Sequence, residues 1–300
     1  MDGIIPLFKP AGLTSHDCVA RLRKLLGTKK VGHTGTLDPA VTGVLPICIN
    51  RATKVAEYMS DYNKTYEAVV SLGSSTTTED QTGEIVDKKV IDNITSAEIE
   101  HVLNEFIGTI KQIPPMYSAV KIDGKKLYEY ARAGKTVERP ARTVEILSLK
   151  LLSDPSRVES GNVTFKIQVS CSKGTYVRTL AVDIGKRLGV PAHMALLVRT
   201  QSGPFKLEDT ISFDELEEVV NDGRISEYVL PIEKAVSIFP STTVSGALEQ
   251  QVLNGAVLEE TKSLSNLRTA VYNEQGECLA IYKPHPKRPG WVKPEKVIKI

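Results

Sequence analysis

The stretch Gly32-His33-Thr34-Gly35-Thr36-Leu37-Asp38-Pro39 is the part of the chain around which the rest is organised. Two glycines and a proline within eight residues exclude a regular helix or a central strand. Pro39 favours an extended backbone at Asp38, which can direct that carboxylate away from the loop. The segment therefore predicts a shaped loop that presents a carboxylate, an imidazole and hydroxyl groups. Asp-Pro alone is also a common start of a turn, so the surrounding sequence decides between these interpretations.

The composition is that of an ordinary globular protein. Of the 300 residues, 41% are hydrophobic and 25% are charged, which is close to the average of folded domains. A chain of this length can bury most of its unfolded surface, as one large domain with a smaller one. No stretch approaches ~18 apolar residues, and the N-terminus lacks a signal-peptide pattern. We therefore expect no membrane span and no membrane partner.

The four cysteines, Cys18, Cys48, Cys171 and Cys278, lie far apart and form no Cys-x-x-Cys pair. This spacing argues against a zinc site or a redox motif. Cys48 lies in an apolar run and Cys171 in an alternating one, so both are predicted to be small core residues. The cysteine pattern fits a reducing compartment and predicts a cytoplasmic protein.

Charge is distributed unevenly, although the net charge is only +2. Residues 121–150 contain eight Lys or Arg against four Asp or Glu, and residues 283–300 contain six against one. Residues 207–235 contain two against nine. Two basic segments on either side of an acidic one suggest two surfaces that bind a polyanion, with ordinary solvated surface as the alternative.

Hydrophobic periodicity predicts a chain of mixed helices and strands. Strands are expected over residues 4–8, 44–49, 64–72, 144–152, 163–171, 268–272, 279–282 and 297–300. Helices are expected from the caps Thr14 or Ser15 to 26, over 51–59, from the capping box Thr95–Glu98 to Gly108, from 177 to 188, and over 247–254. Residues 71–83 are expected to form a polar loop, and 204–231 an acidic helical connector.

Two further features suggest binding. Arg178 lies in the first turn of a predicted helix, where positive charge is disfavoured, so it requires a carboxylate, a phosphate or solvent. Residues 121–134 interleave basic side chains with Tyr128 and Tyr130, which can contact phosphates and stack on bases. The alternative is a helix surface with ordinary buried tyrosines, which this stretch favours when it is taken alone.

Four separated blocks of sequence are distinctive together. They are Lys9-Pro10-x-Gly12-x-Thr14-Ser15, Gly32 to Pro39 followed by x-x-Thr42-Gly43-Val44-Leu45-Pro46, Pro114-Pro115-Met116-Tyr117-Ser118-Ala119-Val120-Lys121, and Cys171-Ser172-Lys173-Gly174-Thr175-Tyr176-Val177-Arg178-Thr179. In this order they closely resemble the TruB family of tRNA pseudouridine synthases, the bacterial enzymes that act on uridine 55 (U55) of the T loop. The resemblance is strong over about residues 4–205 and weaker over the C-terminal part, which resembles a PUA-type RNA-binding domain.

The resemblance implies an α+β fold with a mixed, mostly antiparallel central sheet, flanking helices and a small β-rich PUA-like domain. It implies a catalytic domain over 1–240, with a thumb-like insertion at about 112–142 that closes on the T loop. Residues 241–300 would form the RNA-binding domain.

By position in these motifs, the resemblance implies three catalytic residues. Asp38 matches the catalytic aspartate, Tyr66 the tyrosine that stacks on the base and can accept a proton, and Arg178 the arginine that pairs with the aspartate. The other matches are positions that line the uridine pocket, a structural pair beside it and the start of the thumb: His33, Tyr176 and Leu197, then Lys9 and Pro10, then Lys121.

The implied reaction detaches uracil at N1, rotates it and rejoins it through C5. It requires no metal, redox step or cofactor, because one ionised carboxylate can form the covalent intermediate. An adjacent guanidinium favours that ionised form. Because the base is stacked inside the T loop, it must be flipped out, and His33 can fill the space that it leaves. The implied partner is the T stem-loop of tRNA, bound by a monomer without an obligate protein partner.

Three other classes of protein fit these residues less well than an enzyme of this kind. A non-catalytic tRNA-binding chaperone would not need both Asp38 and Arg178. A phosphotransferase or hydrolase with an aspartate nucleophile would need further carboxylates for a metal, but Asp17 and Glu57 lie in helix patterns. A structural module would not require a carboxylate, a stacking tyrosine and an arginine on separate strand ends.

Overall fold

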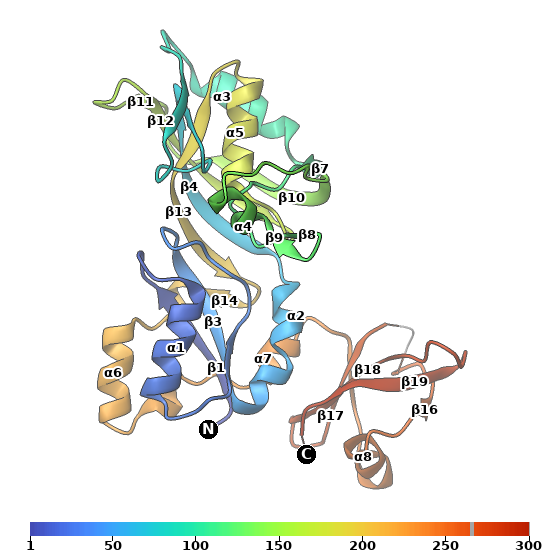
Figure 1. The fold of residues 1–300 in the computed structure, drawn as a ribbon. Coiled ribbons are helices and arrows are strands. Elements are labelled where there is room, and N and C mark those ends of the chain that lie inside the picture. The colour runs from blue at the N-terminus through green and yellow to red at the C-terminus, as the bar shows by residue number, and fades with distance from the viewer. Residues whose placement is uncertain (265–266, 300) are drawn as a thin grey trace. The chain divides into compact units, whose positions relative to one another are not determined.

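The computed structural model describes residues 1–264 and 267–299, which form two compact units (Figure 1). The first unit contains residues 1–39, 43–61 and the chain from residue 203 onward, and the second contains residues 40–42 and 62–202. Each unit combines a β-sheet with helices, which confirms the predicted α+β class. None of the helices in the described residues has the length and apolar character of a membrane span.

Three antiparallel strands form the N-terminal layer of the first unit. Strand β1 (Gly3–Lys9) pairs with β3 (Thr42–Ile49), and β3 also pairs with β2 (Val31–His33). Helices α1 (Ser15–Leu25) and α6 (Phe213–Asn221) share one apolar core with these strands (Figure 1). The loop that contains Asp38 connects β2 to β3.

Helix α1 begins as predicted, because Thr14 is its N-cap and forms a capping box with Asp17. The prediction that residues 51–59 are helical is confirmed, although they form two short helices instead of one. A 3₁₀ helix, η1 (Asn50–Lys54), is followed by a short α-helix, α2 (Ala56–Ser60). The acidic connector contains two more short elements besides α6 and strand β14 (Phe205–Lys206), namely η2 (Leu207–Asp209) and η3 (Ile225–Tyr228), and helix α7 (Glu233–Val236) follows it.

The C-terminal module, defined here as residues 241–299, has a sheet and an apolar core of its own. The strands follow the order β15 (Ser241–Thr243), β17 (Thr269–Tyr272), β18 (Cys278–Pro284), β19 (Trp291–Val297) and β16 (Leu258–Glu259), and helix α8 (Gly246–Leu253) packs on them. This arrangement confirms the expected small PUA-like unit. The strand predicted over 297–300 is wrong: the last strand ends at Val297, and residue 300 lies outside the described residues.

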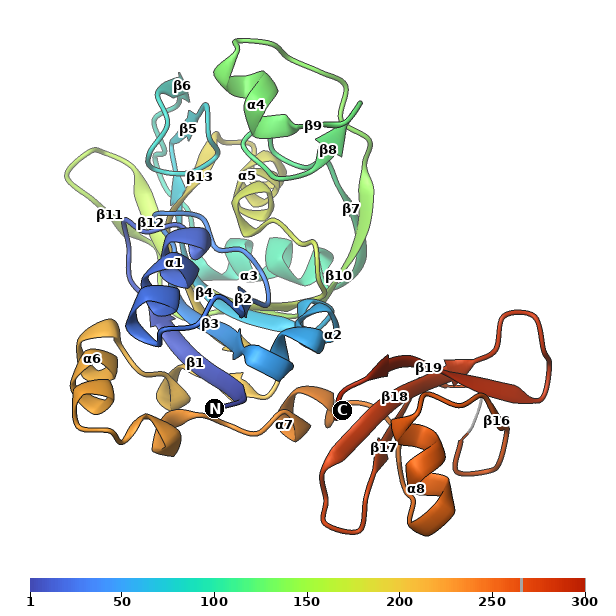
Figure 2. The same cartoon turned by 60° about the horizontal axis from the view of Figure 1, so that its bottom comes forward.

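The second unit is built on five strands that pair antiparallel, in the order β13-β4-β12-β10-β7 (Figure 2). They are β13 (Ala192–Ser202), β4 (Lys64–Leu72), β12 (Val163–Cys171), β10 (Arg142–Leu151) and β7 (Gly108–Gln112). Helices α3 (Ser96–Glu105) and α5 (Val177–Arg187) contact this sheet and each other. The mostly antiparallel sheet with flanking helices agrees with the predicted fold.

The second unit also contains several shorter elements outside these five strands and two helices. The region predicted as a polar loop contains strand β5 (Ser74–Thr76), which pairs with β6 (Ile85–Lys88). The insertion, which we define as the segment between β7 and β10, contains the hairpin β8 (Lys121–Ile122) and β9 (Lys125–Lys126), followed by α4 (Leu127–Arg132). Strand β11 (Ser156–Arg157) pairs with β12.

All four cysteines are buried and none forms a disulfide. Burial raises the pKa of Cys48 to about 12 and that of Cys171 to about 11. Such thiols are poor nucleophiles at neutral pH. The prediction that Cys48 and Cys171 are core residues is therefore confirmed.

Candidate active site

The loop around Asp38 is anchored at both of its flanks in the first unit. The backbone N–H of Leu37 donates to Ser15 Oγ at 2.8 Å, and Ser15 Oγ donates to the carbonyl of Leu37 at 3.3 Å. Thr34, which is fully buried, donates its hydroxyl to the carbonyl of Pro46 at 3.3 Å. Asp38 itself is half-buried. The chain therefore holds the backbone of the loop in place while Asp38 keeps access to the surface.

Lys9 binds the backbone of the same loop through its buried side chain. Its side chain is fully buried, and its ammonium group donates to the carbonyl of Pro10 at 2.8 Å and to that of Pro39 at 3.2 Å. The carbonyl of Pro39 also accepts from the N–H of Gly12 at 2.9 Å. A buried ammonium requires such partners, because removing it from water is costly. The residue after Asp38 is thus held by two donors.

His33 lies at the start of the loop and is hydrogen-bonded to its backbone. Its Nδ1 accepts a hydrogen bond from the N–H of Gly35 at 3.3 Å, which requires an unprotonated Nδ1. Gly35 has a φ of 140°, a conformation that favours glycine. The ring orientation is therefore linked to the backbone conformation of the loop.

Tyr66 lies on β4 in the second unit and is 9% exposed. Its neighbours across the sheet are Val169 on β12 and Arg199 on β13. Arg199 is 1% exposed, so a buried cation lies one strand away from the tyrosine in the register. The central position of β4 gives Tyr66 a rigid support.

Arg178 is 5% exposed in the first turn of α5. Its guanidinium donates to the carbonyl of Thr78 at 2.9 Å and to that of Tyr117 at 2.8 Å. The carboxylate of Asp80 lies 3.8 Å from the same guanidinium. An anionic partner for this arginine was predicted from its position, and Asp80 is one. The pairing of Arg178 with Asp38, which belongs to the other unit, stays a prediction.

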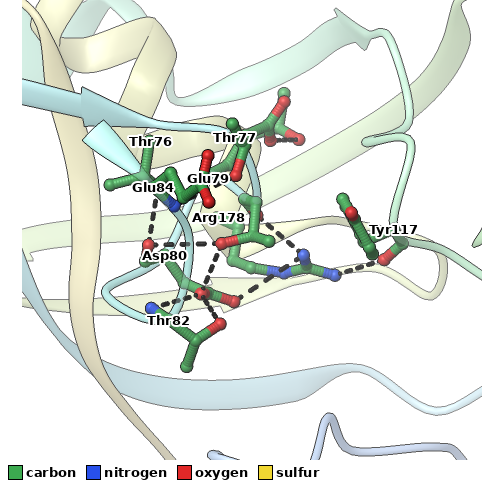
Figure 3. Close-up of polar contacts among 10 residues, drawn as sticks. Thr76, Thr77, Glu79, Asp80, Thr82, Glu84, Tyr117 and Arg178 are labelled. Atoms are coloured by element: carbon green, nitrogen blue, oxygen red, sulfur yellow. Dashed lines mark hydrogen bonds and ion pairs between the residues drawn. The ribbon is translucent and has the colours of Figure 1, made fainter. Parts of the chain in front are cut away.

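Asp80 is in turn held by threonines (Figure 3). Its Oδ1 accepts from Thr78 Oγ1 at 2.7 Å, from Thr82 Oγ1 at 2.6 Å and from the N–H of Thr82 at 2.9 Å. Thr76 Oγ1 donates to the carbonyl of Asp80 at 2.6 Å. Because these bonds satisfy Oδ1, the other oxygen is oriented toward Arg178. The hydroxyl groups of this loop thereby position the carboxylate against the guanidinium.

Glu79 extends this network. It has a φ of 64°, unusual for a residue with a side chain. Its Oε2 accepts from the hydroxyl of Thr179 at 2.7 Å, beside Arg178 on α5. Burial raises the pKa of Glu79, although the hydrogen bond from Thr179 and the charge of Arg178 act in the opposite direction. Its carbonyl accepts from the N–H of Met194 on β13 at 3.0 Å, which ties the loop to the sheet.

The start of α5 is also attached to the end of β7, where the insertion begins. Gln112, which is 2% exposed, donates to the carbonyl of Tyr176 at 3.2 Å and accepts from its N–H at 3.0 Å. Tyr176 is the N-cap residue of α5. Lys121 lies exposed in the β8–β9 hairpin further along the insertion. The base of the insertion and the helix that carries Arg178 are therefore connected through one amide side chain.

Leu197 is 7% exposed on β13. A cavity of about 10 Å³ adjoins it, lined by Ala40, Val41, Asp80, Gln81, Met194, Ala195 and Leu196 besides Leu197 itself. Such a volume holds about one water molecule. A uracil base is larger than this cavity, so the lining side chains would have to move for the base to enter it.

Within residues 1–264 and 267–299, no three His, Cys, Asp or Glu side chains form a group that could hold a metal ion. Each unit contributes part of the predicted site. The first unit contains Asp38, His33, Lys9 and Pro10, and the second contains Tyr66, Arg178, Tyr176, Leu197 and Lys121.

Sequence reasoning missed Asp80, Glu79 and Gln112. A signal for Asp80 was present, because an aspartate flanked by Thr78 and Thr82 matches the local side-chain hydrogen bonding of an Asx turn. Gln112 offered no comparable signal, since its two partners are backbone groups distant in sequence.

The fold defines the class of protein. A Cbf5-Nop10-Gar1 complex contains a chain that superposes with a TM-score of 0.74 at 30% identity, covering 99% of this chain and 84% of that one. The archaeal box H/ACA sRNP Nop10-Cbf5 complex gives a TM-score of 0.70 at 26% identity, covering 99% and 86%. The architecture is that of a pseudouridine synthase.

Sequence comparison identifies the family. The model of the TruB family pseudouridylate synthase N-terminal domain matches residues 23–177, and that of the tRNA pseudouridylate synthase B C-terminal domain matches residues 178–237. The tRNA pseudouridine synthase B of Halalkalibacterium halodurans is 60% identical over 299 residues, covering 99% of this chain and 98% of the relative. That of Bacillus subtilis is 53% identical over 303 residues, covering 99% and 98%. The chain belongs to the TruB family, as the motifs indicated.

Proposed function

We propose that this enzyme converts U55 in the T loop of tRNA to pseudouridine. The observation that carries the proposal is the full-length similarity to relatives named tRNA pseudouridine synthase B. The anchored loop at Asp38 and the buried, positioned guanidinium of Arg178 supply the two groups that the reaction needs most.

The reaction breaks the bond between N1 of uracil and C1′ of the ribose and forms a bond between C5 and C1′. A proton leaves C5 and N1 gains one, so atoms and electrons balance without an outside reagent. Asp38 is the nucleophile in this proposal. Arg178 is assigned the role of keeping that carboxylate ionised, since an opposite charge nearby favours the charged form. Asp38 attacks C1′ or the base in two versions of this mechanism and acts on the 2′ position in a third, and all three use the same carboxylate.

RNA binding follows from charge and shape in this proposal. The flipped uracil stacks on Tyr66, and His33, Tyr176 and Leu197 line its pocket. Lys9 and Pro10 support the loop, and the insertion with Lys121 closes on the T loop. Residues 1–240 form the catalytic domain and 241–300 the RNA-binding domain of a cytoplasmic monomer that needs no cofactor.

The deciding experiment uses an unmodified tRNA transcript with tritium at C5 of its T-loop uridine. Wild-type protein should release tritium to water, and Asp38→Asn should release none while still binding the tRNA. Asp92→Asn, at an exposed position, is the matched control and should retain the wild-type rate. Tight binding by both the wild type and Asp38→Asn, with release by neither, would favour a non-catalytic tRNA chaperone.

The role of Tyr66 is tested separately. Tyr66→Phe keeps the ring that stacks on the base but removes the hydroxyl. If that hydroxyl accepts the C5 proton, the rate at saturating tRNA should fall about 10²–10⁴-fold with little change in KM. A full rate in Tyr66→Phe would remove the hydroxyl from the mechanism.

A further inference from the structure

The second unit contains an arm, defined here as residues 74–88, which leaves the central sheet after β4. The chain turns away from β4 at Gly73, whose φ is 107°. Strands β5 and β6 pair antiparallel along the arm, and the loop between them contains Thr78 and Asp80. Both of these residues contact the guanidinium of Arg178. The placement of the arm on the sheet therefore decides where these two partners of Arg178 lie.

Strand β13 holds the arm through two consecutive residues. The ring of His193 is buried, and its Nδ1 donates to the carbonyl of Ser74, at the start of β5, at 2.9 Å. The N–H of Met194 donates to the carbonyl of Glu79 at 3.0 Å, and the carbonyl of Met194 accepts from the N–H of Gln81 at 3.1 Å. Two neighbouring residues of β13 thus hold both the base of the arm and its loop.

His193 supplies the side-chain part of this attachment. Because a carbonyl oxygen only accepts hydrogen bonds, Nδ1 of His193 carries the proton that it shares with Ser74. The two bonds at Met194 join backbone groups, so a change of side chain there leaves them in place. Among these three bonds, the one from His193 is the bond that a substitution can remove.

A second side chain fixes the base of the arm. Asn162, the residue before β12, donates from Nδ2 to the hydroxyl of Ser71 at 3.0 Å and to that of Ser74 at 2.8 Å. Ser71 is the partner of His193 in the register of β4 and β13. A Cβ at Gly73 would lie 3.0 Å from Oδ1 of Asn162, so the bend between β4 and β5 is closely packed. Donors from two neighbouring strands therefore hold the start of the arm.

Hydrogen bonds within the arm connect its base to its loop. The hydroxyl of Thr76, two residues after Ser74, donates to the carbonyl of Asp80 at 2.6 Å (Figure 3). The N–H of Thr77 donates to the carbonyl of Glu84 at 2.9 Å across the ends of the loop. A displacement of β5 at its base therefore moves the loop with it.

We propose that His193 is a positioning residue for the isomerisation, because it fixes the arm that holds Arg178. The proposal rests on the proposed function and deepens it. The ring of His193 contacts the arm and not the substrate. The arm in turn presents the carbonyl of Thr78 and the carboxylate of Asp80 to the guanidinium. Without the bond from His193, the arm and the guanidinium shift together, and a misplacement of about 1 Å at a reacting site can reduce the rate about 10²-fold.

The test compares two substitutions of His193 on an unmodified tRNA transcript. His193→Leu keeps an apolar side chain at the buried position but cannot donate to Ser74. In His193→Asn, the side-chain amide can donate from about the position of Nδ1. We expect kcat of His193→Leu to fall about 10–100-fold with the KM for tRNA unchanged. His193→Asn should restore kcat to near the wild-type value.

Val144→Ala is the control for lost stability. Val144 is buried on β10, which lies toward the other edge of the sheet from β13, and its truncation leaves a destabilising cavity. It should keep the wild-type kcat. A wild-type kcat in His193→Leu would overturn the proposal, as would a kcat in His193→Asn as low as that of His193→Leu. An equal loss in Val144→Ala would assign the effect to general destabilisation and would also overturn it.

A double-mutant cycle with Asp80→Asn tests the route through the arm. If both side chains act on Arg178 through the arm, the combined fall in kcat should be smaller than the product of the single falls. Falls that multiply would overturn this route. If His193→Leu does not fold, Asn162→Ala replaces it in the same comparison with the same expectations, since it removes the bonds to both serine hydroxyls.

The proposed function is tested separately by the wild type. Absence of turnover by the wild-type protein would overturn that function and this inference with it. Turnover by the wild type, with an unaltered kcat in His193→Leu, would overturn this inference alone.

Discussion

Asp80 accepts hydrogen bonds from threonines of its own loop and lies against the guanidinium of Arg178. In Asp80→Asn the amide oxygen can still accept from Thr82, but the amide nitrogen would face the guanidinium, donor against donor. Arg178 would then shift within its site. If Arg178 has the role that we propose for it, kcat should fall by about 10²-fold, with a small change in KM. Steady-state kinetics on the tRNA transcript measure both constants.

The control for Asp80→Asn is Asp87→Asn, an exposed aspartate on the adjoining strand β6. The same chemical change there should leave kcat unaltered. An Asp80→Asn enzyme with the wild-type kcat would show that Thr78 and Tyr117 position Arg178 without help from the carboxylate.

Glu79 provides a prediction for pH. Its pKa in the folded protein is raised above the ordinary value of 4.5, chiefly by burial. A raised pKa contributes stability below the unfolded pKa, and this contribution is lost as pH rises through the folded pKa. Glu79→Gln keeps an acceptor for Thr179 and removes the titration. The variant should therefore gain stability relative to wild type as pH rises from about 4.5.

Urea unfolding at a series of pH values measures this difference. Glu84→Gln serves as the comparison, since Glu84 belongs to the same loop region but is exposed to solvent. Parallel stability profiles for Glu79→Gln and wild type would contradict a raised pKa at Glu79.

The sequence allowed the capping residues to be predicted, but not the hydrogen bonds around Asp80 and Arg178. Thr14 and Thr95 are recognisable because capping depends on residues three positions apart. The partners of Arg178 come from Thr78, Asp80 and Tyr117, which are distant from it in sequence. Only the folded chain brings such groups together.

The start of α5 is held by a single side chain from β7. Gln112 makes two hydrogen bonds to the backbone of Tyr176, the N-cap of that helix. Gln112→Met has a similar shape but leaves the part-buried N–H and carbonyl of Tyr176 without their partner. We expect the free energy of unfolding to fall by about 2–4 kcal/mol, together with a lower kcat because Arg178 lies two residues further on.

Gln250→Met is the matched control, on the exposed side of α8. Chemical denaturation should show no more than about 0.5 kcal/mol of change there. A Gln112→Met protein as stable as this control would mean that water replaces both of these hydrogen bonds.

Strands with regular alternation were predicted closely, and irregular strands were not. The prediction over 163–171 coincides with β12. β13 was missed because its register shifts twice against β4, at Met194/Leu196 and at Arg199/Gln201, which breaks the period of two. β19 was misplaced because it contains Pro294, which lies beside a register shift against β18, where proline is tolerated.

For the whole molecule, the site was predictable mainly through the motifs. Asp38, Tyr66 and Arg178 lie far apart in sequence and in two compact units, so no local pattern relates them. Periodicity supported mixed α and β structure only, and the antiparallel order of the central strands came from the family resemblance. The charge distribution in the sequence identified the two basic segments, which bear on how the enzyme binds RNA.

The salt dependence of tRNA binding tests the contribution of the second basic segment. Lys287 and Arg288 are both exposed in the C-terminal module. If both bind phosphates, replacing them by glutamine releases fewer counterions on binding. The slope of log K against log salt concentration should then become less steep by about one for each phosphate that the variant no longer neutralises. Filter binding of unmodified tRNA over a range of salt concentrations gives this slope. Lys24→Gln at the exposed end of α1 should leave the slope unchanged, and an equal change in both proteins would assign the effect to net charge instead of to a phosphate-binding surface on the module.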